Sequence, residues 1–292
     1  MKRVLVGLIG ANIQKSLSPA LQEDACVAAG MHGHYHLMDL DVLTGRSLNS
    51  LLDAVRATGF AGVNVTYPCK EAVLPLLDEV SAEARQIGAV NTVTIDRNGR
   101  TAGYNTDRIG FRRAFEDAIG RGAIVGKTAL LVGAGGAGRA VSFALFDLGI
   151  DVLFVHDKDA DRAHRLACTL VSQFGVGRSK AVTEVESALF SAAGLVNATP
   201  VGMVGMPGIP IALGGIQARH WVADVIYTPL ETELVAGVRA KGCKVMGGAG
   251  MCVHQAAESF RLFTGHSPDI HRMRRTFAEA AALRDKTLAE AG

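Results

Sequence analysis

Residues 128–138 read TALLVGAGGAG, a short apolar run that leads directly into the glycine-rich stretch Gly133–Gly138. The apolar pattern resumes after the glycines and predicts a helix over Arg139–Leu148. A strand, a turn of the form G-x-G-x-x-G and a helix, in this order, are the fingerprint of a dinucleotide-binding fold. The stretch therefore predicts an α/β domain with a nucleotide site at this turn.

Each glycine of the pattern has a physical task. Gly133 allows the tight turn, Gly135 lets the backbone approach a pyrophosphate, and Gly138 lets the helix pack close to the strand. Gly136 and Ala137 complete the loop, whose free N–H groups and positive helix end favour phosphate. An ordinary glycine turn is the alternative, which the strand on one side and the helix on the other make less favourable.

Asp157 follows the next predicted strand, Asp151–His156, and lies 22 residues after Gly135. An acid at this place accepts hydrogen bonds from the adenosine ribose and repels the 2′-phosphate of NADP. The sequence therefore predicts NAD as the cofactor and disfavours NADP. Lys158 and Arg162 partly offset that repulsion, and Arg162 is a further candidate contact of the cofactor. The alternative role for Asp157 is to cap the next helix.

Composition excludes several classes of protein. The net charge of +2 on 292 residues leaves no electrostatic footprint for nucleic acid. Five cysteines without a C-x-x-C pair predict neither a zinc site nor a disulfide framework, and they favour a reducing, cytoplasmic compartment. No run approaches the roughly 18 apolar residues that span a membrane. The N-terminal MKRVLVGLIG is interrupted by glycines, so we expect a buried strand there and not a signal peptide.

Apolar strand patterns alternate with helical ones on both sides of this turn, which predicts parallel sheets with helices on their faces. We expect two domains: a substrate-binding catalytic domain over 1–104, completed by about 250–292, and a Rossmann-like dinucleotide-binding domain over 105–249. The C-terminal helices would return to the first domain. The predicted strands are Val4–Ile9, His34–Asp39, Gly62–Thr66, Gly194–Asn197 and Val222–Ile226, and the predicted helices are Pro19–Ala29, Leu48–Thr58, Asp161–Phe174, Val253–Thr264 and Ile270–Ala291.

A turn signal interrupts the parallel pattern. Asn98-Gly99 lies between the strand patterns Thr92–Ile95 and Thr101–Tyr104. This dipeptide favours a hairpin, because both residues tolerate the positive φ angles of a type I′ turn. We therefore expect an antiparallel edge on the first sheet.

Polar side chains follow several strands of the first domain. Ser16-Leu17-Ser18-Pro19 comes after the first strand, Asn64–Lys70 leaves a buried strand and turns at Pro68, and Gly103–Asp107 sits at the domain junction. Open α/β sheets bind ligands at the carboxyl ends of their strands. We expect these segments to form one site, although Ser18 and Asp107 could each be a helix cap and Lys70 a surface residue.

These segments resemble the shikimate dehydrogenase family, in particular its quinate/shikimate dehydrogenase branch, over nearly the whole chain. The resemblance rests on many ordered segments. They are SLSP at 16–19, NVTYPCK at 64–70, GAVNT at 88–92, NTD at 105–107, the glycine loop, NATPVGM at 197–203, DVIYTP at 224–229, and GAGM at 248–251 followed by Gln255.

The resemblance implies a role for each group of residues. Lys70 and Asp107 would be the catalytic pair and would contact the substrate. Ser16, Ser18 and Tyr227 would hold the carboxylate, and Thr66, Asn91, Asp107 and Gln255 the ring hydroxyls. The nicotinamide side would be lined by Thr199, Pro200, Val201, Met203, Val225 and Gly248.

The implied activity is the reversible oxidation of shikimate or quinate to the corresponding 3-dehydro compound, with hydride transfer from the ring carbinol carbon to the nicotinamide of NAD. NADP-using members of the family tend to carry Asn-Arg-Thr where this chain has His156-Asp157-Lys158, which again favours NAD. Quinate-preferring members often have threonine at the position of Ser18, so the preferred substrate stays open. Two alternatives remain: a dehydrogenase of an analogue such as aminoshikimate, and a non-catalytic metabolite sensor.

The sequence gives little indication of a metal ion or of a partner chain. His32, His34 and His36 would share one face of a strand, and no nearby acid or cysteine completes a metal signature, so we expect no metal. The sequence leaves open whether the protein forms a homodimer.

Overall fold

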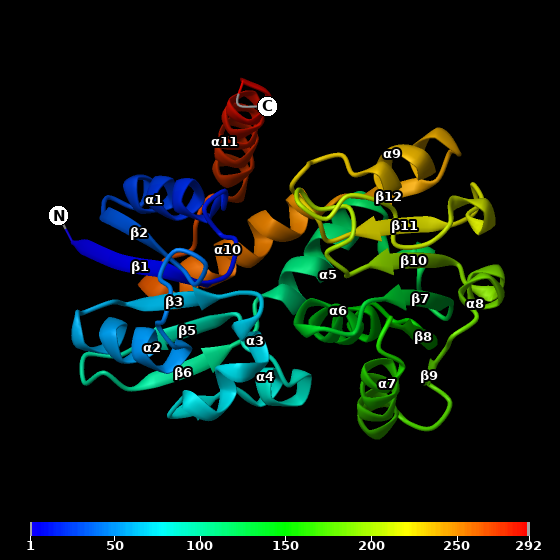
Figure 1. Ribbon diagram of the computed structural model, residues 1–292, viewed down its shortest axis with the longest axis horizontal. Helices are drawn as coiled ribbons and strands as arrows, with labels where there is room; N and C mark the ends of the chain where they lie inside the picture. Colours follow the sequence, from blue (N-terminus) through cyan, green and yellow to red (C-terminus); the bar gives the residue numbers. More distant parts are fainter. Residues whose placement is uncertain (1, 291–292) are drawn as a thin grey trace. The chain divides into compact units, whose positions relative to one another are not determined.

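The protein is described by a computed structural model, in which residues 2–290 are placed, with side chains from 2 to 286 (Figure 1). The chain divides into two units. The first comprises Met1–Thr106 with Val253–Gly292, and the second comprises Asp107–Cys252. Each unit holds a six-stranded sheet with helices against it, so the predicted α/β class is confirmed.

The sheet of the first unit has the order β2-β1-β3-β5-β6-β4. All its neighbouring pairs are parallel except those made by β5, which runs antiparallel to both β3 and β6. The hairpin at Asn98-Gly99 is confirmed, but the predicted antiparallel edge is wrong, because β4 pairs in parallel with β6 and takes the edge position in place of the hairpin. The strands are β1 Arg3–Gly10, β2 His32–Asp39, β3 Gly62–Val65, β4 Glu79–Val80, β5 Thr92–Ile95 and β6 Thr101–Tyr104.

Two apolar clusters cover the two faces of this sheet. On one face α1 (Ser18–Ala28) and α10 (Gly248–Thr264) pack against β1 and β2, with Tyr35 and Phe260 buried. On the other face α2 (Leu48–Ala57), α3 (Cys69–Ala72) and α4 (Ala82–Ile87) contribute to a second cluster with β3 and β5. The alternation of side chains along β1 feeds both clusters.

The C-terminal helices belong to the first unit, as predicted. Arg272 on α11 (Ile270–Glu290) grips the carboxylate of Asp24 on α1 through two N–H···O bonds of 2.6 and 2.8 Å. Because such a two-pronged ion pair fixes orientation as well as distance, it anchors α11 on α1. The predicted end of this helix at Ala291 lies outside the described residues.

The second sheet is entirely parallel and has the order β12-β11-β10-β7-β8-β9. In chain order this is 6-5-4-1-2-3, the doubly wound Rossmann arrangement, whose strand order reverses between β7 and β10. Ligands of such sheets bind at the carboxyl ends of the strands on either side of that reversal. The strands are β7 Thr128–Val132, β8 Val152–His156, β9 Ser179–Ala181, β10 Gly194–Asn197, β11 Trp221–Asp224 and β12 Lys244–Met246.

Helices pack on both faces of the second sheet. α5 (Asp107–Ala118), α6 (Gly136–Asp147) and α7 (Ala160–Phe174) lie together, and the ring of Phe174 stacks on that of Phe146 at 4.0 Å. Helices α8 (Val185–Ser191) and α9 (Glu233–Ala240) pack instead with Leu130 and Val132 of β7. The two sets therefore enclose the sheet and leave the strand ends for ligands.

Several predicted boundaries are wrong for local reasons. The helix expected from Arg139 begins at Gly136, inside the glycine loop. The strand expected over Val222–Ile226 covers Trp221–Asp224, because the amide of Ile226 bonds to the Asp224 carboxylate at 3.0 Å and the chain turns there. The strands β4, β9 and β12, each of two or three residues, and the helices α3, α4, α5, α8 and α9 were not predicted.

Candidate functional site

The glycine loop lies at the reversal of strand order, between β7 and α6. Gly133 has a φ of +102°, and a Cβ on Gly138 would lie 1.9 Å from the carbonyl oxygen of Gly133. A side chain at either place would distort the turn or push the helix away. Gly135 is different, since a Cβ there would meet no atom within 4 Å. The open space over Gly135 is where a pyrophosphate could approach the backbone.

Asp157 follows the last residue of β8 and is half-buried. Its Oδ2 accepts a hydrogen bond from the backbone amide of Ala134 at 2.7 Å, and its Oδ1 accepts one from the amide of Asp159 at 2.9 Å. The helix cap of α7 is Asp159, whose side chain accepts from the amide of Arg162. Asp157 therefore does not cap the helix and instead joins the end of β8 to the glycine loop.

These features fit a dinucleotide. Gly135 is the N-cap of α6 and brings no capping side chain, so the first N–H groups of the helix point toward the open side of the loop. A carboxylate stands at the neighbouring strand end. Arg162 is exposed on the first turn of α7, the helix that follows Asp157.

The nicotinamide-side candidates follow β10 and β11 in the second unit. Thr199, Val201, Met203 and Val225 are half-buried, and Pro200 is exposed. A Cβ on Gly248 would lie 2.4 Å from the carbonyl oxygen of Val225, so this glycine packs directly on the backbone of that loop. The structure therefore gathers these residues around the carboxyl ends of two adjacent parallel strands.

In the first unit, Thr66 and Lys70 both belong to the short segment that follows β3. Thr66 accepts the amide of Cys69 at 2.7 Å through its carbonyl, which starts α3, and Lys70 lies half-buried on that helix. The backbone carbonyl of Lys70 accepts the amide of Val90 at 2.8 Å. This bond ties α3 to the segment that carries Asn91.

The two serines lie at the start of α1. Both are half-buried, and the Ser16 hydroxyl accepts the amide of Ser18 at 3.2 Å. The N-cap of α1 is Leu17, so Ser18 is the first helical residue and not the cap. Its hydroxyl thus has no capping role at that helix end.

A buried polar network holds the remaining substrate candidates of this unit. The Oδ1 of Asn91 accepts the amide of Thr106 at 2.8 Å, and Gln255 lies 3.5 Å from the Thr106 hydroxyl. Asn64 donates to Ser259 at 3.0 Å, and its own Oδ1 accepts from the hydroxyl of Tyr35 at 2.9 Å. Sequence reasoning named the segment of Asn64 but assigned no role to Tyr35 or Ser259. A polar residue in an otherwise apolar strand is the signal that could have found Asn64.

Two predicted substrate residues belong to the second unit. Asp107 is the first residue of α5, directly follows Thr106 and is buried, with 5% of its surface exposed. Tyr227 is half-buried in the segment after β11.

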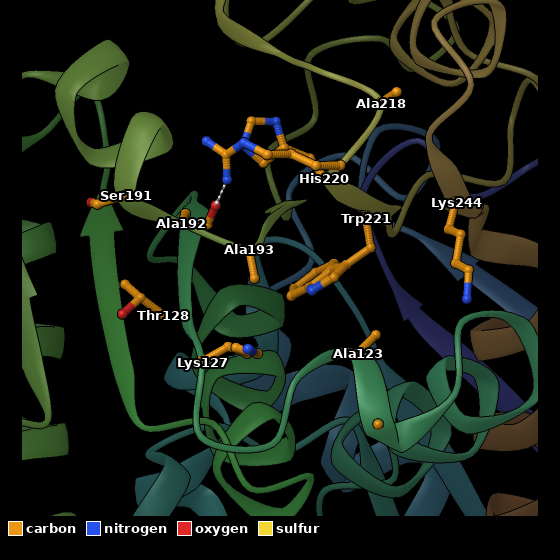
Figure 2. A pocket seen from close by; sticks show the side chains of 12 residues that line it. Ala123, Lys127, Thr128, Ser191, Ala192, Ala193, Ala218, His220, Trp221 and Lys244 are labelled. Carbon is orange, nitrogen blue, oxygen red and sulfur yellow. Dashed lines mark hydrogen bonds between the residues drawn. The ribbon is translucent and has the colours of Figure 1, made fainter.

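A cavity of about 530 Å³ lies at the other end of the second sheet (Figure 2). It is lined by residues at the amino ends of β7, β11 and β12, among them Lys127, Trp221 and Lys244, and by none of the predicted site residues. Arg219 also lines the cavity, and its guanidinium donates to the carbonyls of Ala192 and Phe190. Arg219 thus secures the end of α8, and this cavity is separate from the strand ends that carry the glycine loop.

The three histidines lie on β2 and are exposed. His34 is 3.6 Å from Glu23, and its ring centroid is 6.1 Å from that of His36. Among the side chains described, those of residues 2–286, no three metal-ligating groups come together, and within 2–290 no helix is long and apolar enough to cross a membrane.

Known proteins resemble the chain in sequence and in structure. Residues 8–93 match the family model of the shikimate dehydrogenase substrate binding domain, and residues 248–276 match that of the shikimate 5′-dehydrogenase C-terminal domain. A quinate/shikimate dehydrogenase (NAD(+)) of Corynebacterium efficiens is 46% identical, over 94% of this chain and 97% of its own length. A shikimate dehydrogenase (NADP(+)) of Pseudarthrobacter chlorophenolicus is 44% identical, over 96% of each chain.

Solved structures agree. Quinate dehydrogenase from Corynebacterium glutamicum in complex with NAD superposes with a TM-score of 0.89 at 43% identity, over 96% of this chain and all of the other. Shikimate 5-dehydrogenase from Thermus thermophilus, in complex with NADP(H) and shikimate, gives a TM-score of 0.82 at 38% identity, again over 96% and 100% of the two chains. With identities this high over nearly the full length, the chain belongs to the shikimate dehydrogenase family.

Proposed function

We propose that this chain is an NAD-dependent quinate/shikimate dehydrogenase, which interconverts shikimate or quinate with 3-dehydroshikimate or 3-dehydroquinate. The observation that carries the proposal is the Asp157 carboxylate, bonded at 2.7 Å to the amide of Ala134 in the glycine loop of a Rossmann sheet. An acid at this place serves the ribose hydroxyls of NAD and opposes the 2′-phosphate of NADP. The relatives named for quinate and NAD support the same function.

We infer a division of labour between the two units. The second unit binds the dinucleotide through the glycine loop, Asp157 and Arg162, with the nicotinamide side formed by residues 199–203, Val225 and Gly248. The first unit binds the polyol carboxylate. Thr66, Asn91 and Gln255 contact the ring hydroxyls, while Ser16 and Ser18, with Tyr227 from the second unit, hold the carboxylate.

Lys70 and Asp107 are the proposed catalytic pair. NAD supplies the hydride acceptor when it is bound. The chain must then hold the carbinol carbon in place and move the proton of its hydroxyl. Lys70 exchanges that proton at its Nζ, and Asp107 binds the neighbouring hydroxyl.

A steady-state matrix tests the function: quinate and shikimate, each with NAD and with NADP. We expect kcat/KM to be higher with NAD for both alcohols. A preference for NADP would refute the proposed role of Asp157. If the enzyme oxidised neither quinate nor shikimate but accepted an aminated analogue, the proposed substrate would be wrong.

We also place the protein in the cytoplasm. All five cysteines are free thiols, and four of them are buried, which suits a reducing compartment. Thiol titration of protein purified without reductant tests this: five reactive thiols after denaturation are expected, and fewer would argue for oxidation in the cell.

A further inference from the structure

The last residues of β10 and β11, Asn197 and Asp224, form a buried pair. They are partners in the strand register, and neither exposes any surface. Asn197 donates through Nδ2 to Oδ1 of Asp224 at 3.1 Å. They stand where a ligand-binding strand end would normally present its side chains, yet both are turned into the protein.

Asn197 holds the loop that follows β10. Its Oδ1 accepts from the amide of Thr199 at 3.0 Å and from the Thr199 hydroxyl at 2.7 Å, and its Nδ2 also donates to the carbonyl of Val201 at 3.3 Å. The Thr199 hydroxyl in turn accepts the amide of Val201 at 3.2 Å. Four hydrogen bonds therefore set the path of the loop around one amide side chain.

Asp224 holds the loop that follows β11. Its Oδ1 accepts the amide of Ile226 at 3.0 Å, and its Oδ2 accepts the hydroxyl of Thr232 at 2.7 Å. Thr232 also caps α9 by accepting the amide of Val235 at 3.2 Å. The carboxylate thus connects two strand ends, the turn at Ile226 and the start of a helix.

The protonation of Asp224 matters to this arrangement. It receives three hydrogen bonds, from Asn197, Ile226 and Thr232, and only an ionised carboxylate accepts all of them without a donor of its own. Burial raises the pKa of Asp224, while these three bonds act against the rise. A donor left buried and unpaired loses its hydrogen bonds to water without replacement, so each of the three donors depends on this carboxyl group.

We propose that Asp224 and Asn197 are positioning residues for the nicotinamide half of the cofactor: they fix the two loops, 198–203 and 225–228, without touching it. The inference rests on the proposed cofactor site. On this proposal, different strands of the second unit serve the two halves of the cofactor. The ends of β7 and β8 serve the adenine and pyrophosphate half, and the ends of β10 and β11 serve the nicotinamide half.

Binding of NAD and of ADP-ribose, which lacks nicotinamide, tests the proposal without any turnover. For Asn197→Ala and Asp224→Asn, calorimetry should show about tenfold weaker NAD binding with ADP-ribose within about twofold of the unchanged chain, a loss near 1.4 kcal/mol confined to one half. Equally weakened binding of both ligands, or unchanged binding of both, would overturn the proposal. Ser179→Ala is the matched control, since this hydroxyl is also buried in the second unit and bonds to Leu153 on β8.

Turnover supplies the second readout. A misplacement of about 1 Å costs about 10²-fold in rate, so kcat should fall more than the KM of the alcohol rises in both variants. The deuterium isotope effect on kcat should grow as hydride transfer becomes limiting. Unchanged kcat and isotope effect in a folded variant would overturn the proposal. If the unchanged chain oxidises neither alcohol, the proposed function fails, while the two binding measurements still decide this inference.

If Asp224→Asn does not fold, substitutions of Thr232, at the other end of the hydrogen-bond network, test the same proposal. Thr232→Ser keeps the hydroxyl, and Thr232→Val removes it at nearly constant volume. The serine variant should bind NAD normally and the valine variant should lose NAD selectively over ADP-ribose. Identical behaviour of the two variants would contradict the proposal.

Discussion

The carboxylate of Asp157 and the backbone amide of Ala134 are joined by a 2.7 Å hydrogen bond between the end of β8 and the glycine loop. One oxygen of the acid is therefore committed to the shape of the loop, and the other accepts the amide of Asp159. The carboxylate that we propose to bind the ribose therefore also fixes the loop backbone that we propose to approach the pyrophosphate. Changing it alters both the charge and the shape of the site.

Asp157→Ser should change the choice of cofactor. Loss of the negative charge removes the repulsion of a 2′-phosphate, and loss of the bond to Ala134 loosens the loop for both cofactors. We expect the ratio of kcat/KM for NAD to that for NADP to fall by tenfold or more, about 1.4 kcal/mol. Asp161→Asn, in the first turn of α7, is the control and should leave the ratio unchanged. An unchanged ratio in the serine variant would show that the cofactor is selected elsewhere.

Two glycines of one loop should fail in different ways when changed to alanine. Gly135→Ala adds a methyl group into open space, so the melting temperature should stay near that of the unchanged chain while NAD binding is lost. Gly138→Ala puts a Cβ 1.9 Å from the Gly133 carbonyl, so both stability and binding should suffer. Thermal melts and calorimetry check this. If Gly135→Ala bound NAD normally, the pyrophosphate would have to lie elsewhere.

Lys70→Met should lower kcat by about 10²–10⁴-fold, the range for proton transfer by a placed side chain. NAD affinity should not change, because Lys70 lies in the first unit and the glycine loop in the second. Single-turnover kinetics and NAD titration separate the two effects. A variant that retained its kcat would remove Lys70 from the catalytic pair.

Strong acid should remove the contribution of one local contact, that of Asp78, to stability. The amide and hydroxyl of Thr101, followed by Arg56, lower the pKa of Asp78 from 3.8 to about 2. The depressed value means that the ionised acid stabilises the fold above pH 3.8, and that this contribution disappears as the pH falls through about 2. Urea unfolding of the unchanged chain and of Asp78→Asn should therefore differ at about pH 6 and converge toward about pH 2. A constant difference would mean that the Asp78 contacts do not depend on its charge.

Most of the fold could be predicted because the strands of a buried parallel sheet are continuous apolar runs, as at 128–132 and 194–197. The prediction was wrong where hydrogen bonds decided the outcome. The apolar residues Val225 and Ile226 suggested that β11 continued, but the Asp224 carboxylate captures the amide of Ile226 and ends the strand. The edge of the first sheet is formed by β4 and not by the hairpin, and β4 is a two-residue strand too short to give a pattern.

The candidate site shows the same division. The residue types of the glycine loop and Asp157 follow from the chemistry of phosphate and ribose, so their places could be inferred from spacing. The bonds of Asp157 to Ala134, and of Asn197 to Asp224, join residues 23 and 27 positions apart in the chain. Contacts of this kind depend on how strands align, and no local pattern encodes them.

The second unit is one uninterrupted stretch, Asp107–Cys252, set between the two parts of the first. Its ends lie near one another, since a Cβ on Gly250 would lie 3.1 Å from the side chain of Ala114 on α5. Such a stretch can be exchanged as a block with only two crossovers in the gene. Recombination could therefore alter the coenzyme of a lineage while every proposed substrate residue except Asp107 and Tyr227 is inherited unchanged, and relatives of nearly equal identity named for NAD and for NADP are what such a history would leave.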